Sequence, residues 1–271
     1  MLMEPLHWIT PDDSGVSETI GFILIFSIVI AGIAIVTLYG YPLLLEKQVG
    51  ADEKIMEKNM IVLQNDMKSL AYKTVPFKET SLKIGGGSLT VYSPPGINTS
   101  KLSTFTISNG TTKFAEFQPG ELRYESVKAQ TDLSLHNGAV VMRPTIGEGS
   151  TMIAEPRWFY DTNKHTMVIN LINITSTEIM AKEGIGTVQM TLGDTKYIDE
   201  SWSPSQEVTI KCSFPDPEGN YTVAWDNYLM KTFEKYGMYR VAPGTPGEYE
   251  YRIPGVDELV IKEYEVQIKN I

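Results

Sequence analysis

Cysteine and clustered positive charge are what this sequence most clearly lacks. Its 271 residues include a single cysteine, Cys212, which excludes an intramolecular disulfide framework and every cysteine-based zinc motif. Its 23 lysines and arginines are outnumbered by 33 aspartates and glutamates, which gives a formal net charge of -10. Because phosphate recognition relies on clustered basic side chains, and the sequence has no basic run, it argues against nucleic acid as a partner.

Motifs for catalysis and cofactor binding are also missing. The three histidines, His7, His136 and His165, lie far apart and belong to no metal-binding motif. The glycine run at residues 85–87 lacks the lysine and hydroxyl residue of a phosphate-binding loop, and is better interpreted as a hairpin turn. We therefore expect no metal, no other cofactor and no catalytic residue. A membrane-tethered enzyme is kept only as a third hypothesis.

One segment carries no charge at all. Residues 20–38 read IGFILIFSIVIAGIAIVTL, and nineteen residues at ~1.5 Å each form a helix of roughly 28 Å, close to the thickness of a hydrocarbon core. We predict a membrane-spanning helix, with a buried core helix as the alternative. An ordinary secretory signal peptide is disfavoured, because no lysine or arginine precedes the segment and the apolar run is too long.

The helical pattern continues in amphipathic form over residues 46–73. Its apolar residues alternate at spacings of four and three: Met56, Met60, Leu63, Met67 and Leu70. The pattern predicts one long helix from Ser17 to about Tyr72, whose second half packs one face against another surface. Pro42 removes a backbone donor, so we expect a kink near residues 40–42.

The residues that open the apolar segment resemble a known targeting signal. Residues 14–22, SGVSETIGF, are similar to the class III signal peptides of archaeal type IV pilins and archaellin-like proteins, in which a short polar leader ends in a small residue. The resemblance implies that residues 1–15 are a leader, cut by a prepilin-type peptidase between Gly15 and Val16. It also implies that the helix of residues 16–45 then leaves the bilayer and self-associates in a filament core, while the stripe from Met56 to Leu70 packs against the chain's own sheet.

The charges on either side of the apolar segment depart from the pattern of this family. Asp12 and Asp13 stand in the leader, where the family usually has a lysine or arginine before the cleavage site. Lysines follow the apolar segment and none precedes it, so the positive-inside rule alone would place the C-terminal part in the cytoplasm. The resemblance implies the opposite orientation, and the sequence leaves both open.

Glu18 places a carboxylate at the edge of the apolar helix, where burial is costly without a partner. The resemblance implies that its partner is the new α-amino group of a neighbouring subunit, which would make Glu18 an assembly residue. Alternatively, Ser17 and Glu18 provide an N-terminal cap and a favourable charge at the positive end of the helix dipole. The sequence favours neither interpretation.

Beyond Pro76 the hydrophobic period becomes that of strands. Seven segments alternate or run apolar over strand length: residues 88–92, 102–107, 122–127, 167–172, 187–192, 208–212 and 264–268. Turn sequences separate them, and the pattern predicts an antiparallel, sandwich-like β-rich domain over residues 74–271. Residues 225–236 are predicted to form one amphipathic helix on it. The expected fold class is α+β, with a long N-terminal transmembrane and stalk helix followed by this domain.

The β-rich domain contains four Asn-x-Ser/Thr acceptor sequences, at Asn98, Asn109, Asn173 and Asn220. Each alone is a weak signal, because the motif arises often by chance in a threonine-rich chain. Together they favour an exported, glycosylated domain. Asn173 falls within a predicted strand and is the weakest of the four.

These features predict a structural subunit of an archaeal type IV pilus-like surface filament, anchored in the cell membrane by one span with its β-rich domain outside the cell. Its expected partners are other copies of the chain through the N-terminal helix, the prepilin-type peptidase, the pilus assembly machinery and the membrane. The alternative is an uncleaved, single-span surface glycoprotein whose β domain binds a ligand or an envelope component.

Overall fold

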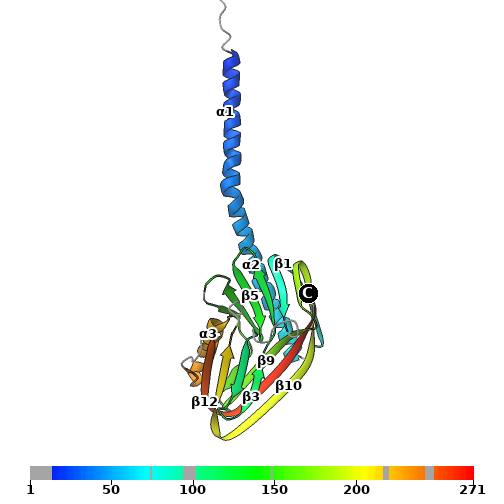
Figure 1. Cartoon of the computed structure of the whole chain (residues 1–271), viewed down its shortest axis with the longest axis vertical. Coiled ribbons are helices and arrows are strands. Elements are labelled where there is room, and N and C mark those ends of the chain that lie inside the picture. Colours follow the sequence, from blue (N-terminus) through cyan, green and yellow to red (C-terminus); the bar gives the residue numbers. More distant parts are fainter. Residues whose placement is uncertain (1–13, 74, 94–101, 148, 216–219, 242–246) are drawn as a thin grey trace, which may run out of the picture. The chain divides into compact units, whose positions relative to one another are not determined.

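The chain divides by its internal contacts into two units, Met1–Gly50 and Ala51–Ile271, shown in Figure 1. We call the second unit the head. A computed structural model describes the chain over these ranges: 14–73, 75–93, 102–147, 149–215, 220–241 and 247–271, with side chains from residue 18 onward. The head begins earlier than the predicted β-rich domain, because the second half of a long helix packs against its strands.

The long N-terminal helix has three parts: α1 (Ser14–Ile35), a π-helical turn η1 (Val36–Gly40) and α2 (Tyr41–Lys73). The predicted helix is therefore confirmed, with slightly wider bounds. The sequence predicts a kink near residues 40–42, and the structure has the π-helical turn just before Pro42, at Val36–Gly40. The Tyr41 N–H donates to the carbonyl of Val36, five residues back. Since Pro42 has no N–H to continue the regular ladder, a widened turn accommodates its ring.

The described part of the head contains twelve strands in one sheet. They are β1 (Phe77–Tyr92), β2 (Thr104–Ser108), β3 (Lys113–Phe117), β4 (Glu121–Ser126), β5 (Thr131–His136), β6 (Ala139–Pro144), β7 (Thr151–Ala154), β8 (Phe159–Asp161), β9 (Thr166–Ser176), β10 (Met180–Ser213), β11 (Tyr239–Val241) and β12 (Glu248–Asn270). The main order is β7-β6-β5-β4-β1-β10-β12-β9-β8, with β2 joined to β10, β3 to β2 and β11 to β12. The seven predicted segments overlap six of these strands, two of them falling in β10, whereas β3, β5, β6, β7, β8 and β11 were not predicted. The α+β class is confirmed.

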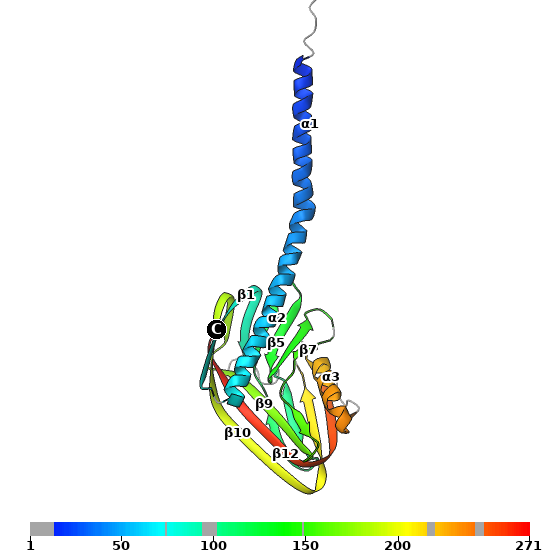
Figure 2. The ribbon, with the colours of Figure 1, turned by 180° about the vertical axis from the view of Figure 1, so that it is seen from behind.

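The central strands differ in one respect from the predicted antiparallel arrangement. β10 and β12 are long antiparallel neighbours that cross the head side by side (Figures 1 and 2). On its other edge β12 pairs in parallel with β9, from Glu258 opposite Thr166 to Ile268 opposite Ser176. A parallel pair requires a long crossover connection, and the residues between β9 and β12 supply it with β10 and a helix. The spacing of apolar residues carries no information about this pairing.

One face of α2 is buried against the sheet within the head. The five residues of the predicted stripe, which we call the α2 stripe, are each 0% exposed: Met56, Met60, Leu63, Met67 and Leu70. They share a hydrophobic cluster with Leu82 and Leu89 of β1. On the same helix, Gln64 donates from Nε2 to the carbonyl oxygens of Gly138 (2.7 Å) and Glu155 (3.1 Å). The prediction that the stripe packs on the chain's own sheet is confirmed.

The sheet separates two hydrophobic clusters. Val140 of β6 belongs to the cluster that contains the α2 stripe, whereas its neighbours Ala139 and Val141 belong to the second cluster, as the alternation of a strand requires. The second cluster includes buried residues of α3 (Thr222–Phe233), which a 3-10 turn η4 (Glu234–Tyr236) follows. The amphipathic helix predicted over residues 225–236 is thus confirmed, and Figure 2 shows it on the head.

The interpretation of residues 85–87 as a hairpin turn is wrong, because the three glycines lie inside β1 at a register shift between Ile84 and Leu89. A Cβ on Gly87 would lie 2.2 Å from the backbone oxygen of Glu125, and Gly86 has a φ of +69°. The glycines therefore allow β1 to bend while its backbone touches neighbouring atoms, a role that needs the same residue type as a turn.

Replacing Leu63 by alanine tests the α2 stripe. We expect a loss of ~2–5 kcal/mol in the free energy of unfolding of the head, because a fully buried leucine is removed and the sheet cannot collapse into the space. Denaturant unfolding of the detergent-solubilised chain would measure it. The control is Val62→Ala on the exposed face of the same helix, expected to change stability by less than ~1 kcal/mol. Equal effects of the two variants would contradict the packing.

Candidate functional site

The apolar helix exposes its side chains all round. Within the unit Met1–Gly50, the described large apolar side chains from Ile20 to Leu44 are between 48% and 74% exposed. The run that includes this segment is the one described helix long and apolar enough to cross a membrane. A helix that is apolar on every face needs lipid or other helices around it. This surface is therefore the first candidate for function.

Two details of the helix suit close packing by a neighbour. Apart from the chain neighbours and the nearby backbone of the helix itself, no described atom lies within 4 Å of the position that a Cβ would occupy on Gly21 or Gly32, so both glycines leave open notches in the helix surface. Small residues of this kind allow helix backbones to approach closely in membranes. Ser27 donates from its hydroxyl to the carbonyl of Ile23 at 2.7 Å, so its polar group is satisfied within the helix.

The predicted processing and assembly residues lie at the start of α1. The backbone of Gly15 and Val16 is helical, and the side chain of Glu18 is exposed. In the uncleaved chain Ser17 is not the N-cap residue, because α1 begins at Ser14 and its first turn contains no acidic residue; in a chain that starts at Val16 both interpretations of Glu18 stay predictions. The effect of the helix dipole falls off within that first turn. Residues 1–13 of the predicted leader lie outside the described residues.

Three of the four glycosylation acceptors fall on described residues, and Asn98 lies outside them. Asn220 is exposed next to α3, and its Oδ1 accepts a hydrogen bond from the N–H of Thr222 at 3.1 Å. Asn109 follows β2 and donates from Nδ2, the atom that would carry a glycan, to Gln206 at 2.6 Å. Asn173 lies in β9 and is half-buried, so the prediction that this acceptor falls within a strand is confirmed. The structure therefore leaves Asn220 as the most accessible acceptor of the three.

A buried polar cluster joins β4, β5 and the residue before α3. At its centre Glu121 pairs with Arg123 and accepts hydrogen bonds from Ser134 Oγ (2.7 Å) and Tyr221 Oη (2.8 Å). Ser103 and His136 extend the cluster, sharing a hydrogen bond of 2.5 Å between Oγ and Nε2. All six side chains are buried: Ser103, Glu121, Arg123, Ser134, His136 and Tyr221. We call these residues the Glu121 cluster.

The Glu121 cluster controls the protonation of its members. Burial lowers the pKa of His136 to about 4, with Glu121 opposing and Arg123 adding to the shift. The Nδ1 atom of His136 is buried without a hydrogen-bond partner among the described residues, so a proton there would be unsatisfied. Burial by itself would raise the pKa of Glu121, but Arg123, His136 and the two hydroxyl donors hold it below its usual value. The cluster is therefore a neutral imidazole beside an ionised pair.

These shifts predict that the head loses stability in acid. The pKa of His136 lies below the value of about 6.5 in an unfolded chain, so its contribution is complete above pH ~6.5 and is lost as the pH falls to about 4. The loss amounts to about 3 kcal/mol, and Glu121 adds to it as the pH falls further. Urea unfolding at a series of pH values would measure it. His136→Gln should flatten the profile between pH 6.5 and 4, whereas His165→Gln, on an exposed turn, should leave it unchanged.

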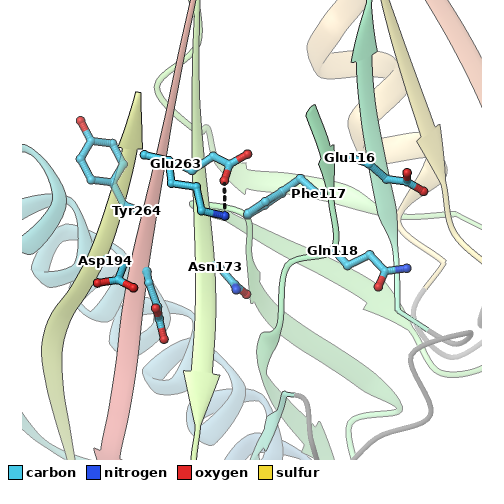
Figure 3. A pocket seen from close by; sticks show the side chains of 9 residues that line it. Glu116, Phe117, Gln118, Asn173, Asp194, Glu263 and Tyr264 are labelled. Atoms are coloured by element: carbon cyan, nitrogen blue, oxygen red, sulfur yellow. Dashed lines mark ion pairs between the residues drawn. The ribbon is translucent and has the colours of Figure 1, made fainter. Parts of the chain in front are cut away.

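A surface pocket of about 290 Å³ lies among β3, β9, β10 and β12 (Figure 3). Two of its carboxylates have partners: Lys196 Nζ lies 3.5 Å from Glu263 Oε2, and Thr175 Oγ1 donates to Glu265 at 2.8 Å. Asn173 lines the pocket and accepts a hydrogen bond from the N–H of Gly120. No three His, Cys, Asp or Glu side chains of the described residues gather closely enough to hold a metal ion. A glycan on Asn173 would have to leave through this pocket.

Comparison with known families assigns the chain to one of them. A family model described as a family of unknown function, DUF7289, matches residues 15–269. The chain belongs to the DUF7289 family. No curated protein and no solved structure matches this DUF7289 chain. The match begins at Gly15, beside the predicted cleavage position, and includes both the apolar helix and the head.

The Glu121 cluster is the feature of this DUF7289 protein that sequence reasoning missed. The charged residues Glu121 and Arg123 alternate with Leu122 and Tyr124 along β4, a pattern typical of a strand with one wet face. In the structure both faces are buried, since Tyr221 covers the charged one. The sequence did contain one indication of the pair, because opposite charges two residues apart lie on the same face of a strand and can pair. Burial of that face depends on a segment one hundred residues away.

Proposed function

We propose that this protein is a structural subunit of an archaeal type IV pilus-like surface filament, made as a membrane-anchored precursor. The observation that carries the proposal is the helix of residues 18–45, which is apolar on all sides, exposed along its length and continuous with a helix that packs into a β-rich head. Burial of ~1.5–3 kcal/mol per large apolar side chain among neighbouring helices would supply most of the free energy of assembly.

In this proposal, processing prepares the helix for assembly. A prepilin-type peptidase hydrolyses the peptide bond between Gly15 and Val16, leaving a carboxylate on the leader and an α-amino group on Val16. The new charged amine stands two residues before Glu18. In a filament the amine of one subunit pairs with Glu18 of its neighbour, which lets both charges enter an apolar core. The start of the family match at Gly15 supports a boundary at this position.

The second candidate is an uncleaved surface glycoprotein with a single membrane span. The exposed acceptor Asn220 favours an exported, glycosylated head in this case as in the first. Here the apolar helix would remain in lipid, and the head would bind a ligand or an envelope component. The two candidates share the anchor and differ in the fate of residues 1–15.

The mature N-terminus distinguishes the two candidates. We expect N-terminal sequencing and the intact mass of the membrane-extracted protein to give a chain that starts at Val16, and electron microscopy of the cell surface to show filaments that contain it. A chain that starts at Met1, with no filaments, would overturn the filament proposal in favour of the second candidate. Protease treatment of sealed cells should degrade the head; complete protection would contradict both candidates.

A further inference from the structure

The head carries three strongly exposed aliphatic side chains on three separate segments. Val127 follows β4 and is 80% exposed, Ile146 follows β6 and is 73% exposed, and Ile185 of β10 is 78% exposed. They are the most exposed large apolar side chains among the described residues of the head. Single exposed aliphatic residues are ordinary on a protein surface, so their positions relative to one another decide whether they matter.

All three lie where α2 enters the head. Ile185 pairs in register with Lys83, whose Nζ lies 3.9 Å from Asp52 Oδ1. The N–H of Val127 donates to the carbonyl of Gly86 at 3.0 Å, and a Cβ on Gly86 would lie 3.8 Å from Asp52. The segments that carry Ile185 and Val127 therefore both pair with the part of β1, residues 83–86, that lies beside Asp52 in the first helical turn of the head.

The segment that carries Ile146 is linked to the same helical turn through the residues at the start of β5. The N–H of Thr145 donates to the carbonyl of Gln130 at 2.7 Å, and Thr131 Oγ1 donates to Glu53 at 2.5 Å. Figure 2 shows β1 and β5 beside α2 at this end of the head. We call Val127, Ile146 and Ile185 the apolar rim.

The chain tethers the apolar rim to the end of the uncharged segment. Residues 19–45 carry no charge; as a helix they are roughly 40 Å long, which matches a bilayer with its headgroup layers. From Leu45 to Asp52 there are seven peptide units, which reach at most about 25 Å even when fully extended. Whatever the relative placement of the two units, Asp52 stays within that distance of the residue that ends the span.

From these positions we infer that the apolar rim inserts into the lipid headgroup layer of the membrane that the N-terminal helix spans. The inference rests on the membrane span of the proposed function and is independent of filament assembly. Interfacial helices bury apolar side chains ~5–10 Å into the boundary between headgroups and acyl chains, and we expect the aliphatic side chains of the rim to reach a similar depth. Lys128 follows Val127, whereas Lys83, opposite Ile185, is paired with Asp52, so the inference rests on the aliphatic side chains and not on charge.

The rim would fix the head against the bilayer before assembly. A single helix leaves a head free to tilt, whereas three further contacts around the entry of α2 restrict it. The three residues come from loops and a bend rather than from a continuous apolar face, so each contributes a shallow contact that a subunit can give up when it leaves the membrane. The reversible affinity expected of such shallow contacts suits a subunit that is stored in the membrane.

Depth-dependent quenching of a fluorophore tests the rim. Val127→Cys, Ile146→Cys and Ile185→Cys are each labelled with a small environment-sensitive thiol dye in the full-length chain and reconstituted into vesicles of zwitterionic and anionic phospholipid. The native Cys212 is buried, and burial raises its thiol pKa, so it should label poorly; the unsubstituted chain measures that background. Phe77→Cys is the matched control, because Phe77 is an exposed apolar residue just beyond the other end of α2.

The expected result is quenching by shallow nitroxide lipids at the three rim positions that exceeds quenching at position 77 by about threefold or more, together with protection from aqueous iodide. Rim dyes that iodide quenches as well as it quenches position 77 would overturn the inference. Protection from both quenchers would also overturn it, and would indicate a second copy of the chain over the rim. A dye at Ile30→Cys, in the middle of the apolar segment, separates the two hypotheses: if deep nitroxide lipids fail to quench it, the membrane span itself is wrong.

Discussion

Replacing Glu18 by alanine should abolish filaments while leaving membrane insertion of the precursor unchanged. In the proposed filament, this carboxylate is the partner of the α-amino group of Val16 on a neighbouring subunit. Without it, an ammonium group would enter the helical core unpaired, at a cost of ~2.5–3.5 kcal/mol per subunit. Such a cost weakens each subunit contact by a factor on the order of 100. Electron microscopy of surface filaments and carbonate extraction of membranes would measure assembly and insertion separately.

The matched control is Glu46→Ala at the other end of the uncharged segment. Glu46 is exposed like Glu18 and is the next charged residue along the chain, so its loss changes the net charge equally. We expect filaments from Glu46→Ala in normal number. Glu18→Gln keeps the shape of the side chain and should fail like Glu18→Ala, because the pairing needs a charge. Normal filaments from either variant of Glu18 would remove its proposed role.

Replacing Glu121 by alanine should lower the free energy of unfolding of the head by ~3–5 kcal/mol. The change leaves the buried guanidinium of Arg123 with the more exposed Glu125, whose Oε1 lies 3.7 Å from Nη1, and with the ring of Tyr92, 4.7 Å away. The hydroxyls of Ser134 and Tyr221 also lose their acceptor. Chemical denaturation of the detergent-solubilised chain, followed by tryptophan fluorescence, would measure the loss.

Two further variants show whether the loss of stability comes from leaving a buried charge unpaired. Glu116→Ala removes one partner of the exposed pair with Lys113 and should change stability by less than ~1 kcal/mol. The double variant Glu121→Leu with Arg123→Met removes both charges together and should recover part of the loss, because no unpaired ion stays buried. A single-variant effect as small as that of Glu116→Ala would show that water reaches the cluster.

The pattern of apolar residues was a reliable guide wherever burial depends on local periodicity. The spacing of four and three from Met56 to Leu70 predicted the buried face of α2 residue by residue. The alternation in residues 208–212 predicted a strand, which is part of β10. Neither needs knowledge of the partner, because a helix or strand with one apolar side must bury that side against something.

Turn chemistry was less reliable, because glycine serves several purposes. Asn137-Gly138 forms the tight connection of β5 and β6 with positive φ at both residues, as its sequence predicts. The glycines of residues 85–87 have the same composition signal and lie inside a strand. Their role is set by the backbone of Glu125 and the side chain of Asp52, which come from other parts of the chain.

The sequence by itself determined the division of this protein into an uncharged helix and an α+β head, the buried face of α2 and the positions of six of the twelve described strands. Each of these follows from hydrophobic period, a local property. Only the tertiary structure decided the parallel pairing of β9 with β12, the burial of Glu121 and His136, and the links of the apolar rim to the helical turn of Asp52 and Glu53. These features depend on which distant segments of the chain meet in space. The sequence around a charged or aliphatic residue does not show whether its neighbour in the folded protein is water, a tyrosine or a lipid.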